Sequence, residues 1–205
     1  MTETDRYMEN TGLVNLLEMD GSIVADIKYG TSDNFTGQPL YTAKFGVYLQ
    51  PEIAKAVVEV NKRLREIYPT RRVIVFDAAR PLSVQKKMYE AVKGSPYEAY
   101  IANPYGEYPG GFHNYGLAVD LSITDLNEGE LDMGTPYDSF SEAAHTGDED
   151  ALVKRGVLGR DAYANRMLLY SLTGEQGLKP HPNEWWHYQT NYSEDSKAGY
   201  QLLDF

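Results

Sequence analysis

The stretch that decides the fold reads HNYGLAVDLSI and spans residues 113–123. From residue 117 to residue 123, apolar side chains alternate with small or polar ones, which is the two-residue period of a β-strand with one apolar face. Asp120 is therefore expected on the face opposite to the apolar side chains. Gly116 comes directly before this strand, where a residue without a Cβ lets the backbone turn tightly.

The preceding segments predict a helix, a strand and a second helix. Pro51 to Tyr68 has apolar residues at helical spacings of three and four, with proline in the first turn. Residues 73–76 (VIVF) form a short apolar run that predicts a buried strand, which a proline at position 81 ends. Ser83 is then expected to cap a helix that presents Val84, Met88 and Val92 to the core.

The second half of the chain alternates loops with regular structure. Ser95 to Gly111 is rich in Pro, Gly and Tyr and predicts a long loop, and residues 125–150 are acidic and rich in turn formers. Residues 151–172 are expected to be helical, at least from Asp161 through Leu172. A breaker cluster at 180–183 precedes a strand at 184–190. The whole predicts an α+β fold in a single domain (residues 1–205), with helices packed on a central antiparallel or mixed sheet.

Composition excludes several classes of function. The 205 residues include 19 Lys and Arg against 30 Asp and Glu, and the net charge of −11 argues against nucleic-acid binding. Cysteine is absent and there are four histidines, so a zinc site would need His and carboxylate ligands. No membrane span or signal-peptide pattern is visible, which predicts a cytoplasmic protein, or a periplasmic or secreted one if a signal peptide had been removed.

Two short stretches contain the residues with metal-ligand potential. Six residues separate His113 from Asp120, and two separate Glu184 from His187. Two histidines and one carboxylate form a three-ligand zinc set with a position left for water, and a further glutamate could accept the proton of that water. The spacing also allows simpler interpretations: a surface histidine, a solvated aspartate and a charge at the start of a strand.

Two alternatives concern other polar residues. Arg80 could serve in catalysis or be a structural ion-pair partner of a carboxylate. His145 lies in the acidic segment and His181 lies between prolines, so both are expected at the surface.

Together and in this order, the motifs resemble the D-alanyl-D-alanine dipeptidases, the VanX type of zinc peptidase. The resemblance covers nearly the whole chain and implies a Hedgehog/DD-peptidase-like zinc peptidase fold with one Zn²⁺ per chain. The EWWHY form and the N-terminal motifs are more specific to the dipeptidases than the general ligand spacing, which related carboxypeptidases share. The matching segments are DAARP (77–81), HNYGLAVDL (113–121), EWWHY (184–188), IKYGT (27–31), DNFTG (33–37), MG (133–134), YD (137–138), NR (165–166) and DF (204–205).

The resemblance also implies roles for individual residues. The zinc ligands fall on His113, Asp120 and His187, and the catalytic base falls on Glu184. The arginine that steadies the oxyanion of the tetrahedral intermediate falls on Arg80. The carboxylate that binds the free α-amino group falls on Asp138, and pocket-lining tyrosines fall on Tyr29 and Tyr41. One position departs from the family: Gly111 replaces the usual serine two residues before the first histidine.

The implied activity is zinc-dependent hydrolysis of D-alanyl-D-alanine, or a similar D,D-dipeptide, to two amino acids. The expected partner is this small dipeptide, and neither nucleic acid nor a membrane span is expected. A D,D-carboxypeptidase or other cell-wall peptidase acting on longer stem peptides is the alternative, and a non-catalytic metal-binding module is a third. Resistance to a glycopeptide antibiotic, self-immunity and recycling of D-alanine would all use the same chemistry.

Overall fold

The computed structural model describes residues 2–41, 46–191 and 193–204, and Phe205, the last residue of the matched motifs, lies outside them. Strands and helices are interspersed along the chain. The strands are β1 (Val14–Asn15), β2 (Val24–Ala25), β3 (Tyr48–Leu49), β4 (Arg71–Asp77), β5 (Ala118–Asp125), β6 (Gly129–Glu130), β7 (Lys179–His181) and β8 (Glu184–Gln189). The α-helices are α1 (Glu3–Asn10), α2 (Leu16–Met19), α3 (Pro51–Ile67), α4 (Leu82–Val92), α5 (Glu149–Lys154) and α6 (Arg160–Glu175). Short 3₁₀ turns are η1 (Lys28–Gly30), η2 (Glu98–Tyr100), η3 (Phe112–Tyr115), η4 (Glu142–Ala144) and η5 (Glu194–Gly199).

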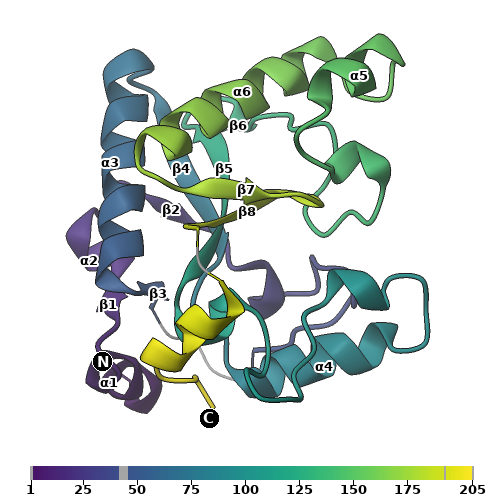
Figure 1. Ribbon diagram of the computed structural model, residues 1–205. Coiled ribbons are helices and arrows are strands. Elements are labelled where there is room, and N and C mark those ends of the chain that lie inside the picture. The colour runs from purple at the N-terminus through teal and green to yellow at the C-terminus, as the bar shows by residue number, and fades with distance from the viewer. Residues whose placement is uncertain (1, 42–45, 192, 205) are drawn as a thin grey trace.

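The larger sheet is mixed. Its strand order is β2-β4-β5-β8-β7, with β6 paired to β5, and only the β2–β4 pair among these is parallel. Helices α3 and α6 pack against it and against each other (Figure 1). The α+β class with a mixed sheet flanked by helices is therefore confirmed. A separate two-stranded sheet pairs β1 with β3.

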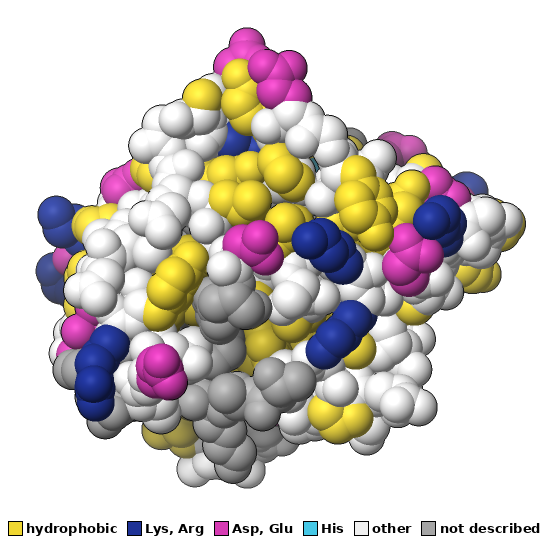
Figure 2. All heavy atoms as spheres, turned by 90° about the horizontal axis from the view of Figure 1, so that it is seen from below, with side chains coloured by type: hydrophobic (Ala, Val, Ile, Leu, Met, Phe, Trp, Pro, Cys, Tyr) yellow, Lys and Arg dark blue, Asp and Glu magenta, His cyan; other side chains and the backbone are white. Residues whose placement is uncertain are grey.

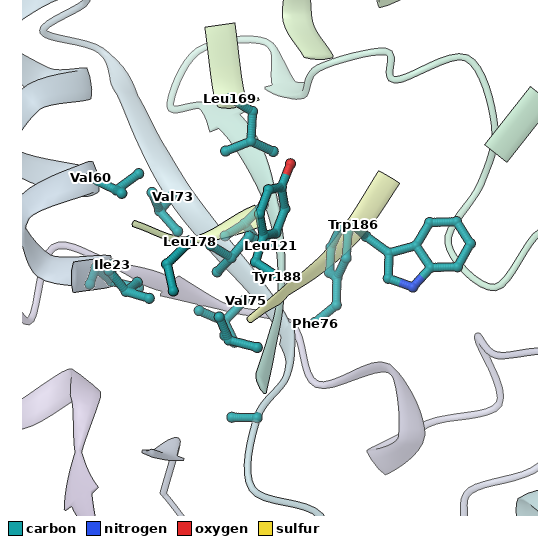
Figure 3. Packing of buried hydrophobic residues seen from close by; sticks show 14 of the residues in the cluster. Ile23, Val60, Val73, Val75, Phe76, Leu121, Leu169, Leu178, Trp186 and Tyr188 are labelled. Carbon is teal, nitrogen blue, oxygen red and sulfur yellow. The ribbon is translucent and has the colours of Figure 1, made fainter. Parts of the chain in front are cut away.

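The main core lies between the sheet and helices α3 and α6. Side chains from α3, β4, β5 and α6 meet there, as Figure 3 shows for Val60, Val73, Leu121 and Leu169. All four are at most 1% exposed, so the periodic apolar positions of the sequence are those that exclude water. Strand β5 is buried on both faces, which means that Asp120 is not the solvated residue that a polar strand face would suggest.

Helix boundaries differ from expectation where local chemistry decides them. Helix α3 is confirmed and ends at Ile67, one residue before the expected end. Helix α4 begins at Leu82 with Pro81 in the N-cap position, so the expected cap at Ser83 is wrong: that serine lies in the first turn. Helix α6 confirms the helix from Asp161 through Leu172, but residues 155–159 separate it from α5.

The breaker cluster at 180–183 forms a hairpin instead of a loop. Pro180 and His181 belong to β7, which lies at the edge of the sheet, where a residue without an N–H costs no ladder hydrogen bond. The hairpin leads directly into β8, which confirms the strand expected after Asn183.

The surface carries charges of both signs. The face seen in Figure 2, on the side of α1 and α4, shows acidic and basic side chains between apolar ones. Among the described helices, none combines the length and the apolar character that a membrane crossing requires.

One buried arginine connects α6 to the segment that precedes α5. The Arg166 side chain is fully buried; its Nε and Nη2 each donate to a backbone carbonyl at 2.7 Å, those of Met133 and Ala143. Arg166→Met should lower the free energy of unfolding by about 2–4 kcal/mol, because it leaves these buried carbonyls without donors. Chemical denaturation would measure the change. Arg160→Met, on an exposed position of the same helix, is the matched control; equal stability of the two variants would contradict the assignment.

Candidate functional site

Strand register assembles the site. In the sheet, Asp77 of β4 pairs with Asp120 of β5, and Asp120 pairs with His187 of β8, so the three residues form one row across adjacent strands. His113 lies in η3, just before β5. Gly116 joins the two with φ +69°, and a Cβ there would lie 2.6 Å from Leu13 Cδ2, so this tight turn requires glycine.

Three of the expected residues bring their ligand atoms together. His113 Nε2 lies 3.0 Å from His187 Nδ1 and 3.1 Å from Asp120 Oδ1, and His187 Nδ1 lies 3.3 Å from Asp120 Oδ1. Ligands at about 2.0–2.1 Å from a tetrahedral zinc ion are separated by about 3.4 Å, so the group has the right donors at nearly the right spacing. Among the described residues, this is the group of His and carboxylate side chains that could hold a metal ion.

Hydrogen bonds orient both imidazole rings toward the same point. His113 Nδ1 donates to the backbone carbonyl of Ala78 at 2.8 Å, which leaves Nε2 with its lone pair for a metal. His187 Nε2 bonds to Oε1 of Gln189 at 3.0 Å, which leaves Nδ1 in the same state. Burial by itself would raise the pKa of Asp120, but His113 and His187 hold this pKa well below its usual range. Asp120 is therefore an ionised carboxylate, which is the form that binds a metal ion.

Glu184 reaches the site because β8 bulges. Residue 180 pairs with 188 but residue 181 pairs with 184, so three residues of β8 lie opposite a single step of β7. The bulge brings the Glu184 carboxylate within 3.7 Å of His187 Nδ1, although residues three apart in a straight strand point to opposite faces. Burial raises the pKa of Glu184 to about 7. A carboxyl group with this pKa can accept and return a proton near neutral pH.

Arg80 is buried and held by several groups. Its Nε donates to Asp77 at 2.7 Å, its Nη1 donates to Gln85 at 2.8 Å, and its guanidinium lies 4.9 Å from the centre of the Tyr29 ring. The ion pair with Asp77 is the structural role that the sequence left open for Arg80. Nη2 is 3.8 Å from Asp120, so the fixed guanidinium also borders the metal ligands.

Asp138 lies in a turn and is held by two donors. Its φ of +61° is in the left-handed region that non-glycine residues seldom adopt, and such geometry is often found at binding sites. The Tyr29 hydroxyl donates to one carboxylate oxygen at 2.8 Å and the backbone N–H of Phe35 donates to the other at 3.1 Å. The two donors by themselves would lower the pKa of Asp138, but burial has the larger effect and raises this pKa to about 7.

A cavity of about 270 Å³ joins these groups. Its lining includes the metal-ligand group, Glu184, Arg80, Asp138 and Tyr29, and also Gly111. A Cβ at Gly111 would lie 3.3 Å from the Ala102 side chain in the loop after α4, so this loop packs tightly at the rim. Tyr41 is not among the residues that line this cavity: its hydroxyl donates to Asp77 at 2.6 Å, and the same carboxylate accepts from Nε of Arg80.

Sequence reasoning missed some of the site residues. His181 was expected at the surface, but it is half-buried, lines the cavity and stacks edge-to-face on His187 at 5.4 Å. Burial lowers its pKa to about 4, so this ring is neutral. Its position three residues before Glu184 was the available signal, once a hairpin was considered. His145 is not in the cavity lining and contacts Tyr100.

Most of the chain is similar to proteins named D-alanyl-D-alanine dipeptidase. A family model, Peptidase_M15, described as D-ala-D-ala dipeptidase, matches residues 9–200. A D-alanyl-D-alanine dipeptidase of Escherichia coli K12 is 24% identical over 95% of this chain and 91% of its own length. Proteins of the same name from Enterococcus faecalis and Enterococcus faecium are 26% and 28% identical, over 89% and 86% of this chain and 92% and 90% of their own lengths.

The ligand geometry predicts the effect of removing one histidine. His113→Ala should reduce bound zinc after dialysis from about one ion per chain to a small fraction of that, because two ligands alone hold zinc weakly. Metal analysis by atomic emission, with circular dichroism to verify folding, would measure this. His145→Ala is the control and should keep its zinc. Full zinc content in His113→Ala would show that the ligand set is wrong.

Proposed function

Since this chain belongs to the Peptidase_M15 family of D-alanyl-D-alanine dipeptidases, we propose that it hydrolyses D-alanyl-D-alanine, or a closely similar D,D-dipeptide, to two free amino acids. It is a zinc metallopeptidase, and His113, Asp120 and His187 would hold the ion. The observation that carries the proposal is that one small cavity joins this group to a carboxyl base, a fixed guanidinium and a carboxylate suited to an ammonium group. The proposed catalytic domain comprises residues 1–205, and its cytoplasmic location stays a prediction.

Glu184 is the proposed base. A bound zinc ion would act as a Lewis acid: it would polarise the scissile carbonyl and lower the pKa of a water molecule toward about 7. Glu184 then takes a proton from the attacking water and gives it to the leaving amine. The group must be a base before the attack and an acid after it, and burial favours the second transfer because it raises the pKa of Glu184 above its ordinary value.

Arg80 is the proposed stabiliser of the oxyanion. Two of its nitrogens are held by Asp77 and Gln85, which leaves Nη2, the nitrogen near Asp120, for the substrate. A guanidinium fixed in this way loses little entropy when negative charge develops on the carbonyl oxygen, so it stabilises the transition state more than the ground state. The structural and catalytic roles of Arg80 are thus compatible.

Asp138 is the proposed partner of the free α-amino group of the dipeptide. A buried carboxylate without a cationic partner is costly, and a bound ammonium would relieve that cost. Tyr29 would support this contact by fixing the carboxylate. A cavity of about 270 Å³ is also below the roughly 300–1,000 Å³ typical of sites for drug-sized ligands. These features favour a dipeptide over the longer stem peptide that a D,D-carboxypeptidase would take.

Two further observations bear on substrate range and on the third alternative. Gly111 lines the cavity and offers no hydroxyl to the substrate at the position where the resemblance implies a serine, so the substrate preference can differ from that of relatives with the serine. A non-catalytic metal-binding module would have no use for Glu184 and Arg80, because neither belongs to the metal-ligand group.

The substrate assignment predicts selectivity for a free amino terminus. D-Ala-D-Ala should be cleaved with a kcat/KM at least roughly 30-fold above that of N-acetyl-D-Ala-D-Ala, because the acetylated substrate cannot form the ion pair with Asp138. Amine release, assayed with and without a chelator, would measure this. In Asp138→Asn, the ratio of kcat/KM between the two substrates should be smaller than in the wild type. Equal kcat/KM values for both substrates with the wild-type enzyme would contradict the dipeptidase assignment.

The base assignment predicts loss of turnover without loss of metal. Glu184→Gln should keep about one zinc per chain and lower kcat by roughly 10²–10⁴-fold, because the amide cannot accept the proton of water. Paired kinetic and metal analyses would measure both. Glu142→Gln removes a carboxylate from an exposed ion pair with Arg155 and should leave kcat unchanged. Substantial turnover in Glu184→Gln would remove this residue from the role of base.

A further inference from the structure

We propose that Tyr137 is a positioning residue of the metal centre: its hydroxyl holds the outer oxygen of Asp120 and so keeps this carboxylate oriented to bind zinc through the other oxygen. The inference rests on the metal site of the proposed function. Tyr137 is not one of the proposed metal ligands and acts through Asp120. Tyr137 comes from the turn after β6, more than ten residues from its partner in sequence.

The two oxygens of Asp120 have different surroundings. Oδ1 faces the two histidines, at 3.1 Å from His113 Nε2 and 3.3 Å from His187 Nδ1. Oδ2 accepts a hydrogen bond from the Tyr137 hydroxyl at 2.7 Å. A carboxylate can bind a cation through one oxygen or through both, and the terminal torsion of aspartate is soft. The hydroxyl therefore favours the one-oxygen mode, which keeps a zinc position open for water.

A second cation lies close to the same oxygen. Arg80 Nη2 is 3.8 Å from Asp120 Oδ2. If Oδ2 had no other donor, the carboxylate could rotate toward the guanidinium, because paired two-oxygen contacts with arginine are strong. Such a rotation would turn Oδ1 away from the histidines and use the guanidinium nitrogen that the oxyanion needs. The neutral Tyr137 hydroxyl satisfies Oδ2 and keeps the two cation sites apart.

Packing fixes the aim of the hydroxyl. The Tyr137 ring lies 5.2 Å from the Phe76 ring and 5.3 Å from Trp186, with Tyr29 at 5.8 Å, all at steep angles. Figure 3 shows Phe76 and Trp186, two of the side chains that enclose this ring. The ring packing would be the same for phenylalanine, so substitution of Tyr137 by Phe removes the hydroxyl and its bond to Asp120 but keeps the ring in place. The next residue is Asp138, so one turn serves both the metal ligand and the proposed substrate carboxylate.

The test is the zinc affinity of Tyr137→Phe in the full chain. Removing a group that orients a metal ligand typically weakens metal binding by roughly 10–100-fold, and competition with a chromophoric chelator would measure the zinc Kd directly. Tyr89→Phe is the matched control, because its hydroxyl donates to the Glu98 carboxylate at the same 2.7 Å outside the metal-ligand group. We expect the Kd to rise about tenfold or more in Tyr137→Phe and to change less than about twofold in the control.

A second readout separates positioning from general stability. The visible absorption spectrum of the Co²⁺-loaded protein depends on ligand geometry, so it should shift in Tyr137→Phe and match the wild type in Tyr89→Phe. Wild-type zinc affinity and an unshifted Co²⁺ spectrum in Tyr137→Phe would overturn the inference while leaving the proposed function intact. A wild-type chain that binds no zinc would overturn both. A change in unfolding temperature alone, with unchanged metal affinity, would count against a positioning role.

Discussion

The pairing of β5 between β4 and β8 is the constraint on which the site depends. Because Asp77, Asp120 and His187 share one row of this pairing, backbone hydrogen bonds hold three polar residues from distant parts of the chain on adjacent strands. Their side chains inherit the rigidity of a sheet that is buried on both faces at β5. A slip of one residue in either pairing would move Asp120 to the opposite face and dissolve the site.

This row contributes to an excess of buried carboxyl groups over cationic side chains in and around the cavity. Asp77 and Asp120 are almost completely buried, and Glu184 and Asp138 lie beside them, while Arg80 is the one Lys or Arg among the described residues that line the cavity. Burial therefore raises the pKa of Glu184 and Asp138 to about 7. An enclosed excess of carboxyl groups favours cations, and the chemistry proposed here brings two of them: the metal ion and the ammonium group of the dipeptide.

Neutral donors then assign each carboxylate to its cation. Tyrosine hydroxyls bond to three of the carboxylates: Tyr41 to Asp77, Tyr137 to Asp120 and Tyr29 to Asp138. At Asp77 the other oxygen accepts from Arg80, and at Asp120 the other oxygen faces the two histidines. At Asp138 the other oxygen accepts from the backbone N–H of Phe35. Three of the 17 tyrosines of the sequence therefore serve as hydrogen-bond donors to buried carboxylates.

The sequence by itself predicted the three longest strands, β4, β5 and β8, and the longer helices, because apolar periodicity is local and is written directly in residue order. Its short motifs also named the candidate ligand group. The short strands β1, β2, β3, β6 and β7 were not predicted. The helix ends near Pro81 and Gly159 and the hairpin at Pro180 were less well predicted, since a proline or glycine marks a break but does not specify the conformation of the residues after it.

Only the tertiary structure decided how these pieces act together. Packing places His181 in the cavity, and the bulge in β8 brings Glu184 beside His187. Packing also brings the hydroxyl of Tyr41 to Asp77 and that of Tyr137 to Asp120. No local pattern encodes them, because burial and the distance between two side chains are properties of packing, which residue order specifies only through the complete fold.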